Sequence, residues 1–329
     1  MTGALSTTVA SGTSGLLAGI GASVLQVIGV AVGGPLLLGL MAKVRARAEG
    51  RRGAPVTQVL ADLRKLVRKE AVRAHHTSVV SLLAPRVLVA SSSVAVAMSP
   101  LLTTRPVAAR GADLFAVVFL LLVGSVALAL LGLDAGTAFG GMGSSRAMTV
   151  GAISEPALLV AVVALAVQSQ TSNLPGLVTA SLAHPGWLAS PQRLLALVAL
   201  VIVVIAETGR LPVDNPSTHL ELTMIHEAMI LECAGPDLAL VTVGEAMRLG
   251  LLLGLLANLF FPWGVGVSGS LPGILGGMGA LAAKTALVAA LIAVVEVSTA
   301  KLRLFRVPEL LAGAFVLGIV AVTTALVSR

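Results

Sequence analysis

The sequence predicts an all-α fold: a polytopic membrane protein with about eight transmembrane helices plus an amphipathic cytoplasmic helix. Of its 329 residues, 57% are hydrophobic and only 11% are charged, whereas about 25% of the residues of a soluble domain are charged. Long apolar runs such as 113–133 and 192–206 are too hydrophobic for one face of a soluble helix. A helix needs about 20 such residues to cross a bilayer, because the hydrocarbon core is about 30 Å thick. These observations exclude a soluble globular domain.

Eight apolar windows are predicted to cross the membrane, and neither a linker nor an internal repeat separates them. Residues 1–329 are therefore predicted to form a single membrane domain. The windows are 14–41, 77–102, 113–133, 147–169, 191–207, 238–261, 273–298 and 308–327. The window 191–207 is short, and 147–169 is interrupted by Glu155 and Pro156.

The first loop, residues 42–76, contains a predicted helix of a different kind. Around the segment 58–70, apolar residues recur with the spacing of a single helix face, and charged residues occupy the other faces. The apolar positions are Val56, Val59, Leu60, Leu63, Leu66 and Val67. One interpretation is a surface helix that lies in the lipid headgroups. The other is a docking surface for a cytoplasmic partner, and both can hold together.

Positive charge is concentrated in the loops on one side of the predicted spans. Fifteen Lys or Arg residues fall there, ten of them in the loop 42–76, and four fall on the other side. The positive-inside rule then places both termini outside, and the loops 42–76 and 207–237 in the cytoplasm. The same rule and anionic lipid account for the net charge of +7, so no nucleic-acid partner is predicted.

Six charged residues lie away from the ends of the predicted spans: Arg86, Glu155, Glu245, Arg248, Lys284 and Glu296. Each costs about 2.5–3.5 kcal/mol near a helix centre, and such residues usually face a hydrated cavity and mark an ion or proton path. Glu245 and Arg248 are three residues apart and could instead pair along one helix face. Glu155 has no local partner, which favours a functional role.

The stretch 207–237 holds six of the 15 acidic residues: Glu207, Asp214, Glu221, Glu227, Glu232 and Asp237. After Pro212 and Pro216, residues 217–232 are predicted to form a helix on which Glu221 and Glu232 share a face. Carboxyl groups at the edge of the bilayer suit a proton relay, because burial raises their pKa toward the working pH. The alternative is an acidic face that pairs with basic residues of a neighbour.

Metal binding by this chain is not predicted. Cys233 is the only cysteine, so no thiolate cluster can form. The HExxH motif is absent, because Ile230 stands four residues after His226.

The stretch 207–237 resembles the signature of the complex I subunit 1 family, whose members include a membrane subunit of bacterial NADH:quinone oxidoreductase. It is most similar to the hydrogenase branch, which includes the membrane subunits of formate hydrogenlyase, hydrogenase-4 and other energy-converting [NiFe]-hydrogenases. Residues 58–70 are similar to the first-loop helix of the family, and residues 145–159 to its fourth span. The resemblance covers most of the chain.

The resemblance implies a proton path along acids that match those of the family: Glu155, Glu207, Asp214, Glu221 and Glu232. Arg146 and Arg210 match family arginines, and we group them with Glu245 and Arg248 as supporting charges. The chain departs from the complex I branch at Ser217 and Thr218, where that branch carries another acid. It also has Cys233-Ala234 in place of Tyr-Ser, and its first loop lacks the Gln-x-Arg-x-Gly-Pro-Asn run. These departures favour the hydrogenase branch and leave quinone binding open.

What the resemblance implies about function is a non-catalytic subunit of an oxidoreductase complex in the bacterial cytoplasmic membrane. Such a subunit couples electron transfer to proton translocation and binds no metal or cofactor of its own. Its implied partners are a hydrogenase-like large subunit, an iron–sulfur small subunit and antiporter-like membrane subunits, with the iron–sulfur clusters and any NiFe centre in those partners. Docking is expected on the loops 42–76, 207–237 and 299–309, with Arg64, Lys65, Lys69, Arg303 and Arg306 as contacts.

Three alternatives stay open at the level of the sequence. The first is the quinone-chamber subunit of a complex I type dehydrogenase. The second is a stand-alone ion or proton transporter, and the third is an anchor with a structural role only.

Overall fold

The fold is helical, as predicted. The computed structural model describes residues 2–74, 76–104, 109, 111–214, 224–266 and 271–328, and for residues 2–18 and 271 the backbone alone. Within these residues the chain forms eleven α-helices and two short 3-10 helices, η1 (Pro185–Ala189) and η2 (Leu304–Arg306).

Seven of the described helices are long and apolar enough to cross a membrane. They are α1 (Thr2–Ala48), α3 (Val79–Met98), α4 (Leu114–Asp134), α5 (Ala138–Ser169), α9 (Gly235–Phe260), α10 (Leu271–Ser298) and α11 (Val307–Val327). The eighth predicted span is α7 (Pro191–Glu207), whose 17 residues are fewer than the roughly 20 of a full crossing. The short length of α7 leaves its last residue, Glu207, inside the bundle, where its side chain is 7% exposed.

Three helices differ from the prediction. Helix α1 spans Thr2–Ala48 where 14–41 was predicted, because the Ser- and Thr-rich residues before this window and the basic residues after it lower the hydropathy. Helix α5 begins at Ala138, nine residues before the predicted 147, because the Thr137 side chain accepts a hydrogen bond from the Gly140 amide and caps it. The glycine-rich first turns of α5 add little hydropathy and therefore fall outside the apolar window. Helix α6 (Leu174–Ala183) is not predicted, since its ten residues are too few for a span.

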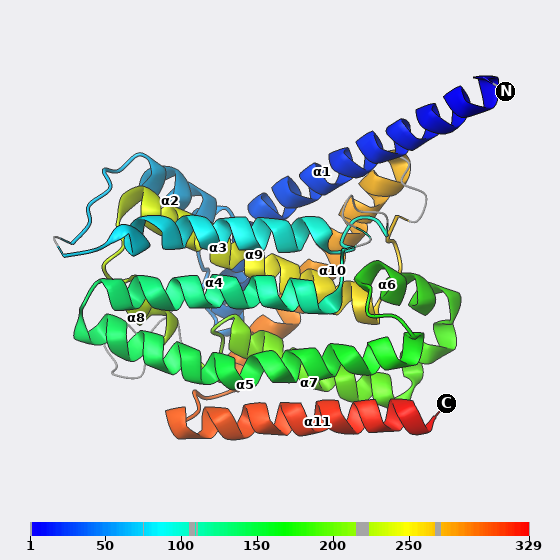
Figure 1. The fold of residues 1–329 in the computed structure, drawn as a ribbon. Helices are drawn as coiled ribbons and strands as arrows, with labels where there is room; N and C mark the ends of the chain where they lie inside the picture. Colours follow the sequence, from blue (N-terminus) through cyan, green and yellow to red (C-terminus); the bar gives the residue numbers. More distant parts are fainter. Residues whose placement is uncertain are drawn as a thin grey trace.

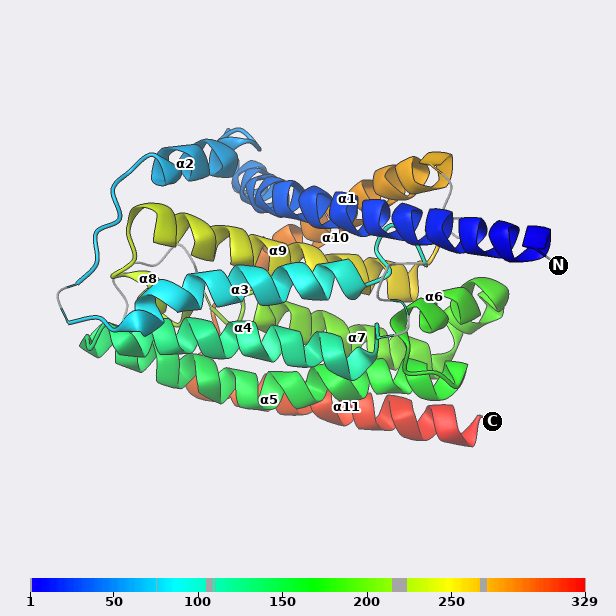
Figure 2. The same ribbon diagram turned by 45° about the horizontal axis from the view of Figure 1, so that its top comes forward.

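The predicted amphipathic helix is confirmed as α2 (Gln58–Val67). Its apolar face packs against α1 and α9 through the buried Leu63, so that the charged faces point away from the bundle (Figure 2). The chain reaches α2 by crossing α1 at Gly39, where a β-carbon would overlap the Val56 carbonyl.

The predicted helix 217–232 is only partly described. Helix α8 (His226–Ile230) is its observed part, and Ser217, Thr218 and the rest of 215–223 lie outside the described residues.

The ends of the bundle carry different segments (Figure 1). Both chain termini lie at one end, which we call the terminal end, and α2 and α8 lie at the other. We call this second end the loop end; its described residues are 49–74, 76–78, 208–214, 224–234 and 299–306. The arrangement places the two predicted cytoplasmic loops on the same side.

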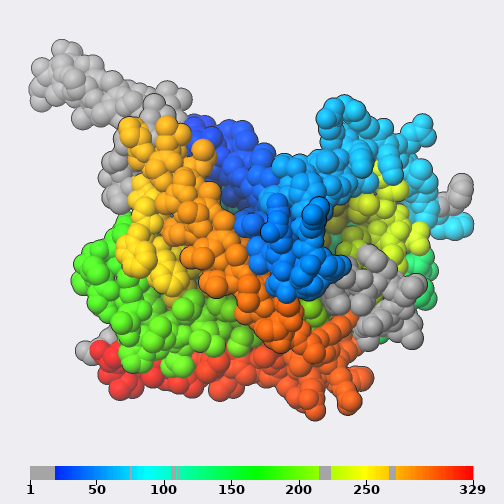
Figure 3. Space-filling view, turned by 180° about the vertical axis from the view of Figure 1, so that it is seen from behind, coloured from blue at the N-terminus to red at the C-terminus, as the bar shows by residue number. Residues whose placement is uncertain are grey.

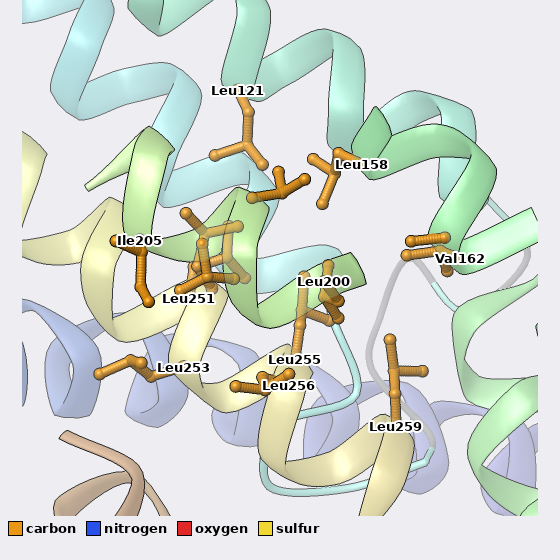
Figure 4. Close-up of a cluster of buried hydrophobic side chains, with 14 of the residues drawn as sticks. Leu121, Leu158, Val162, Leu200, Ile205, Leu251, Leu253, Leu255, Leu256 and Leu259 are labelled. Atoms are coloured by element: carbon orange, nitrogen blue, oxygen red, sulfur yellow. The ribbon is translucent and has the colours of Figure 1, made fainter. Parts of the chain in front are cut away.

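Helix α9 is the centre of the bundle. It packs against α1, α3, α7 and α10, and nearly all residues from Ala246 to Phe260 are buried around its whole circumference, which is typical of a core helix. Figure 4 shows its leucines, including Leu251 and Leu255, among side chains of α4, α5 and α7. Figure 3 shows the molecule from behind relative to Figure 1, and on this face α1 and α10 lie side by side at the surface.

The orientation can be tested by cysteine labelling in spheroplasts. We expect Ala54→Cys, in the exposed first loop, to resist a membrane-impermeant maleimide until the membrane is opened, because the positive-inside rule retains this loop in the cytoplasm. Gly186→Cys, exposed at the terminal end, should react in intact spheroplasts.

The natural Cys233 gives a low background. Burial, together with the charges of Asp237 and Glu232, raises the pKa of its thiol to about 11, and the thiolate is the reactive form. Labelling of Ala54→Cys in intact spheroplasts would show that the orientation is the reverse of the predicted one.

Candidate functional site

Two neighbouring cavities lie toward the loop end of the bundle. Cavity A, of about 280 Å³, is lined in part by Arg45, Glu207, Arg210, Asp214, His226, Glu227, Glu245 and Arg248. Cavity B, of about 170 Å³, lies between α4, α5, α7 and α9, and its polar lining is Ser125, Ser154, Glu155, Glu207, His226 and Arg248. Three side chains line both cavities: Glu207, His226 and Arg248. They form the partition between them.

A buried ion pair within this partition joins α9 to α7. Nη2 of Arg248 donates to Oε2 of Glu207 at 2.9 Å and to the Ser125 hydroxyl at 2.8 Å. The Ser154 hydroxyl donates to the other carboxylate oxygen of Glu207. The pairing of Glu245 with Arg248 along α9 is not what the structure has, since Arg248 reaches across to α7 and Glu245 lines cavity A instead.

Asp214 is the most highly connected acid of cavity A. Its carboxylate is almost fully buried and accepts hydrogen bonds from the amides of Ile225 and His226, both at 3.2 Å. Nζ of Lys301 lies 3.5 Å from Oδ1. Asp214 therefore joins the segment after α7 to α8 and to the loop 299–306.

His226 lies against the same carboxylate. Its Nδ1 is 3.6 Å from Oδ2 of Asp214, slightly beyond a direct hydrogen bond. Burial alone would lower the pKa of the imidazole, but Asp214 and the negative charge of Glu245 outweigh it, so the pKa lies above its ordinary value.

Glu296 forms a third group of buried charges. Its side chain is fully buried near the end of α10, with Arg45 at 3.6 Å and Arg210 at 3.7 Å. Burial lowers the pKa of the Arg210 guanidinium, and Glu296 offsets part of this effect. One carboxylate thus holds together α1, α10 and the segment after α7.

The structure brings together most of the predicted proton-path and supporting residues. Glu155 lines cavity B, Asp214, Arg210 and Glu245 line cavity A, and Glu207 and Arg248 line both. Arg146 lies beside the site, where its guanidinium donates to the Met224 carbonyl at 3.3 Å.

One predicted acid, Glu232, is not part of this assembly. Glu232 is exposed and lies in a separate small hollow with Arg73 and Asp237. The prediction placed it beside the bilayer core because it matches an acid of the family, but α8 ends at Ile230 and Glu232 lies in the exposed turn that follows. Glu221 lies outside the described residues.

The predicted docking residues are all exposed. Arg64, Lys65 and Lys69 lie on or just after α2. Arg303 precedes η2, and Arg306 is its last residue. All five are at the loop end.

Sequence reasoning missed four members of the site. It treats His226 only as a possible zinc ligand, Glu227 only as one of the acids of its stretch, and Lys301 only as a loop cation. It recognises Glu296 as a buried charge but gives it no role. A signal for Glu296 was present, because a lone acid in an apolar helix requires a cationic partner.

These features define a multi-pass membrane protein with a charged interior. Residues 21–327 match the protein family described as NADH dehydrogenase, and the chain belongs to this family. This confirms the predicted membership of the complex I subunit 1 family. Hydrogenase-4 component C of Escherichia coli (strain K12) is 32% identical over 230 residues, which are 70% of this chain and 71% of that protein. Formate hydrogenlyase subunit 4 of the same organism is 28% identical over 276 residues, 84% of this chain and 89% of that protein.

The fold itself is also known from a solved structure. A chain of the membrane-bound sulfane sulfur reductase, an archaeal respiratory membrane complex, superposes with a TM-score of 0.80 and 21% sequence identity. The match covers 92% of this chain and 98% of the other. The two chains therefore share their fold.

The ion pair in the partition generates a stability prediction. Arg248→Met leaves the buried Glu207 carboxylate without its cation, and breaking such a pair costs about 3–5 kcal/mol. We expect a lower Tm for this subunit in the purified complex. The double variant Arg248→Met/Glu207→Gln should recover much of the loss, because no uncompensated charge is then buried.

The matched control is Arg52→Met, which removes an exposed arginine and should leave the Tm unchanged. A Tm of Arg248→Met equal to that of Arg52→Met would show that the pair contributes nothing.

Proposed function

We propose that this chain is a non-catalytic membrane subunit of an energy-converting [NiFe]-hydrogenase-like complex, in which it couples electron transfer to proton translocation. It would anchor a peripheral arm made of a hydrogenase-like large subunit and an iron–sulfur small subunit. The observation that carries the proposal is the row of acids that line two adjoining cavities. The two hydrogenase and hydrogenlyase relatives support this branch over the quinone-reducing one.

The path we propose starts at Glu155 in cavity B and continues through the partition at Glu207. It leaves toward the loop end through Asp214, Glu227 and Glu245 in cavity A. Carboxyl groups in such low-dielectric surroundings change protonation in response to a nearby charge, whereas exposed ones stay ionised. An electron that arrives on an iron–sulfur cluster of the arm is such a charge. Its arrival would favour proton uptake by the acids of cavity A.

The loop end has the properties of a docking surface. Phe305 is 88% exposed between Arg303 and Arg306, and Val67, Val72 and Leu231 are exposed at the same end. Exposed apolar side chains rimmed by charge are typical of protein-interaction sites. The backbone amide of Leu302 donates to the Pro212 carbonyl at 2.9 Å. A partner on the 299–306 loop would therefore act directly on the segment that holds Asp214.

The proton role can be tested with Glu155→Gln and Glu207→Gln. Gln keeps the size of Glu but cannot ionise, and a positioned acid or base contributes about 10²–10⁴-fold to proton transfer. We expect either change to lower proton movement in vesicles at least tenfold while the arm stays bound.

Glu232→Gln is the matched control, because Glu232 is exposed and lines neither cavity. Wild-type proton movement in the Glu155→Gln/Glu207→Gln double variant would reduce the site to a structural role. Ion exchange by the purified chain alone would favour a stand-alone transporter.

Docking is tested by charge reversal. Arg303→Glu/Arg306→Glu should release the soluble arm from membranes at ordinary salt concentration, because both side chains are exposed beside the apolar Phe305. Gly186→Glu, which adds an acid at the terminal end, should retain the arm. Retention of the arm by the double reversal would place the docking surface elsewhere.

A further inference from the structure

His226 is the third side chain of the partition, beside the paired Glu207 and Arg248. Both carboxylate oxygens of Glu207 are engaged, one by Arg248 and the other by Ser154. Nδ1 of His226 is buried and has no hydrogen-bond partner in the described part of the chain. Of the three side chains that line both cavities, only the imidazole can both accept and release a proton at neutral pH from separate atoms.

The backbone is shaped to leave room for this ring. Gly209 has φ +58°, a conformation that favours glycine. A β-carbon at Gly209 would lie 2.6 Å from Nδ1 of His226 and 2.9 Å from Cε1. Any other residue at this position would be strained and would also displace the imidazole from Asp214.

Asp214 is the acceptor that the geometry offers. Its Oδ2 also takes the backbone amide of His226, so that the ring and the carboxylate move as one unit. The distance between Nδ1 and Oδ2 is 3.6 Å and must shorten to about 2.8 Å for direct transfer.

We infer that His226 acts in series with Glu207 at the partition and transfers the proton to Asp214 in cavity A. A proton that arrives at Nε2 gives the imidazolium, and transfer of the Nδ1 proton to Oδ2 of Asp214 returns the neutral ring. One proton has then crossed the partition, Asp214 has become a neutral acid, and the charge of the ring is unchanged. The inference rests on the proposed function and adds a residue to it.

The test uses the intact complex in membrane vesicles and measures protons moved per electron transferred, together with arm retention. His226→Gln should lower proton movement at least tenfold with the arm still bound. His76→Gln, an exposed histidine at the same end, is the matched control and should behave as the wild type. Full proton movement in His226→Gln would overturn the inference.

If the complex that carries His226→Gln does not assemble, a second pair of variants tests the role of His226. Gly209→Ala crowds the ring, whereas Gly136→Ala places the same substitution at a positive φ of +64° with nothing within 4 Å. Loss of proton movement in Gly209→Ala alone supports the inference. Equal behaviour of the two variants contradicts it.

Chemical rescue separates proton transfer from mere packing. In His226→Ala, added imidazole should restore proton movement, and the similarly shaped but weakly basic pyrazole should not. Rescue by both compounds would show that His226 only fills space, and would contradict the inference.

The outcomes also separate this inference from the proposed function. Loss in Glu207→Gln with full activity in His226→Gln would remove His226 and keep the path. Full activity in the Glu155 and Glu207 variants would remove the path itself.

Discussion

The structure depends on one constraint: charges that lie inside an apolar bundle must be compensated there. Arg248 meets Glu207 across two helices at 2.9 Å, and Glu296 lies between Arg45 and Arg210. Each pair joins segments that are distant in the sequence, so the same contacts that neutralise charge also position α1, α7, α9 and α10. Removal of one partner leaves a buried charge and is strongly unfavourable. The site is therefore built into the packing of the bundle.

Contacts of Asp214 connect the loop end to the acids of cavity A. Asp214 contacts α8 through two backbone amides and the loop 299–306 through Lys301. That loop carries the exposed Phe305 and is tied to the segment after α7 through Leu302 and Pro212. A partner that docks at the loop end would thus meet a rigid connection to cavity A. Coupling requires such an element, because a distant binding event otherwise has no differential contact with the acids.

Most of the fold follows from local sequence. The apolar run of α9, predicted at 238–261 and observed as Gly235–Phe260, is long enough to be recognised from hydropathy alone, and the spacing of apolar residues in α2 predicts its single packed face. The site follows only in part. The sequence identifies the acids but not the acid that pairs with Arg248. The spacing in the sequence offers only Glu245, three residues away, as a possible partner. The choice of Glu207, 41 residues away, depends on how α7 and α9 pack. The position of the His226 ring likewise depends on Gly209, and no periodic pattern in the sequence reveals this contact.

In the proposed function, acids in the two cavities change protonation when the complex is reduced. Infrared difference spectroscopy of the purified complex, reduced minus oxidised, measures this directly in the carbonyl-stretch region of protonated carboxyl groups. We expect a band that appears on reduction, shifts in deuterated buffer and changes when Asp214 is replaced by Asn. A difference spectrum with no carboxyl band, or one that is identical in the Asp214→Asn variant, would contradict it.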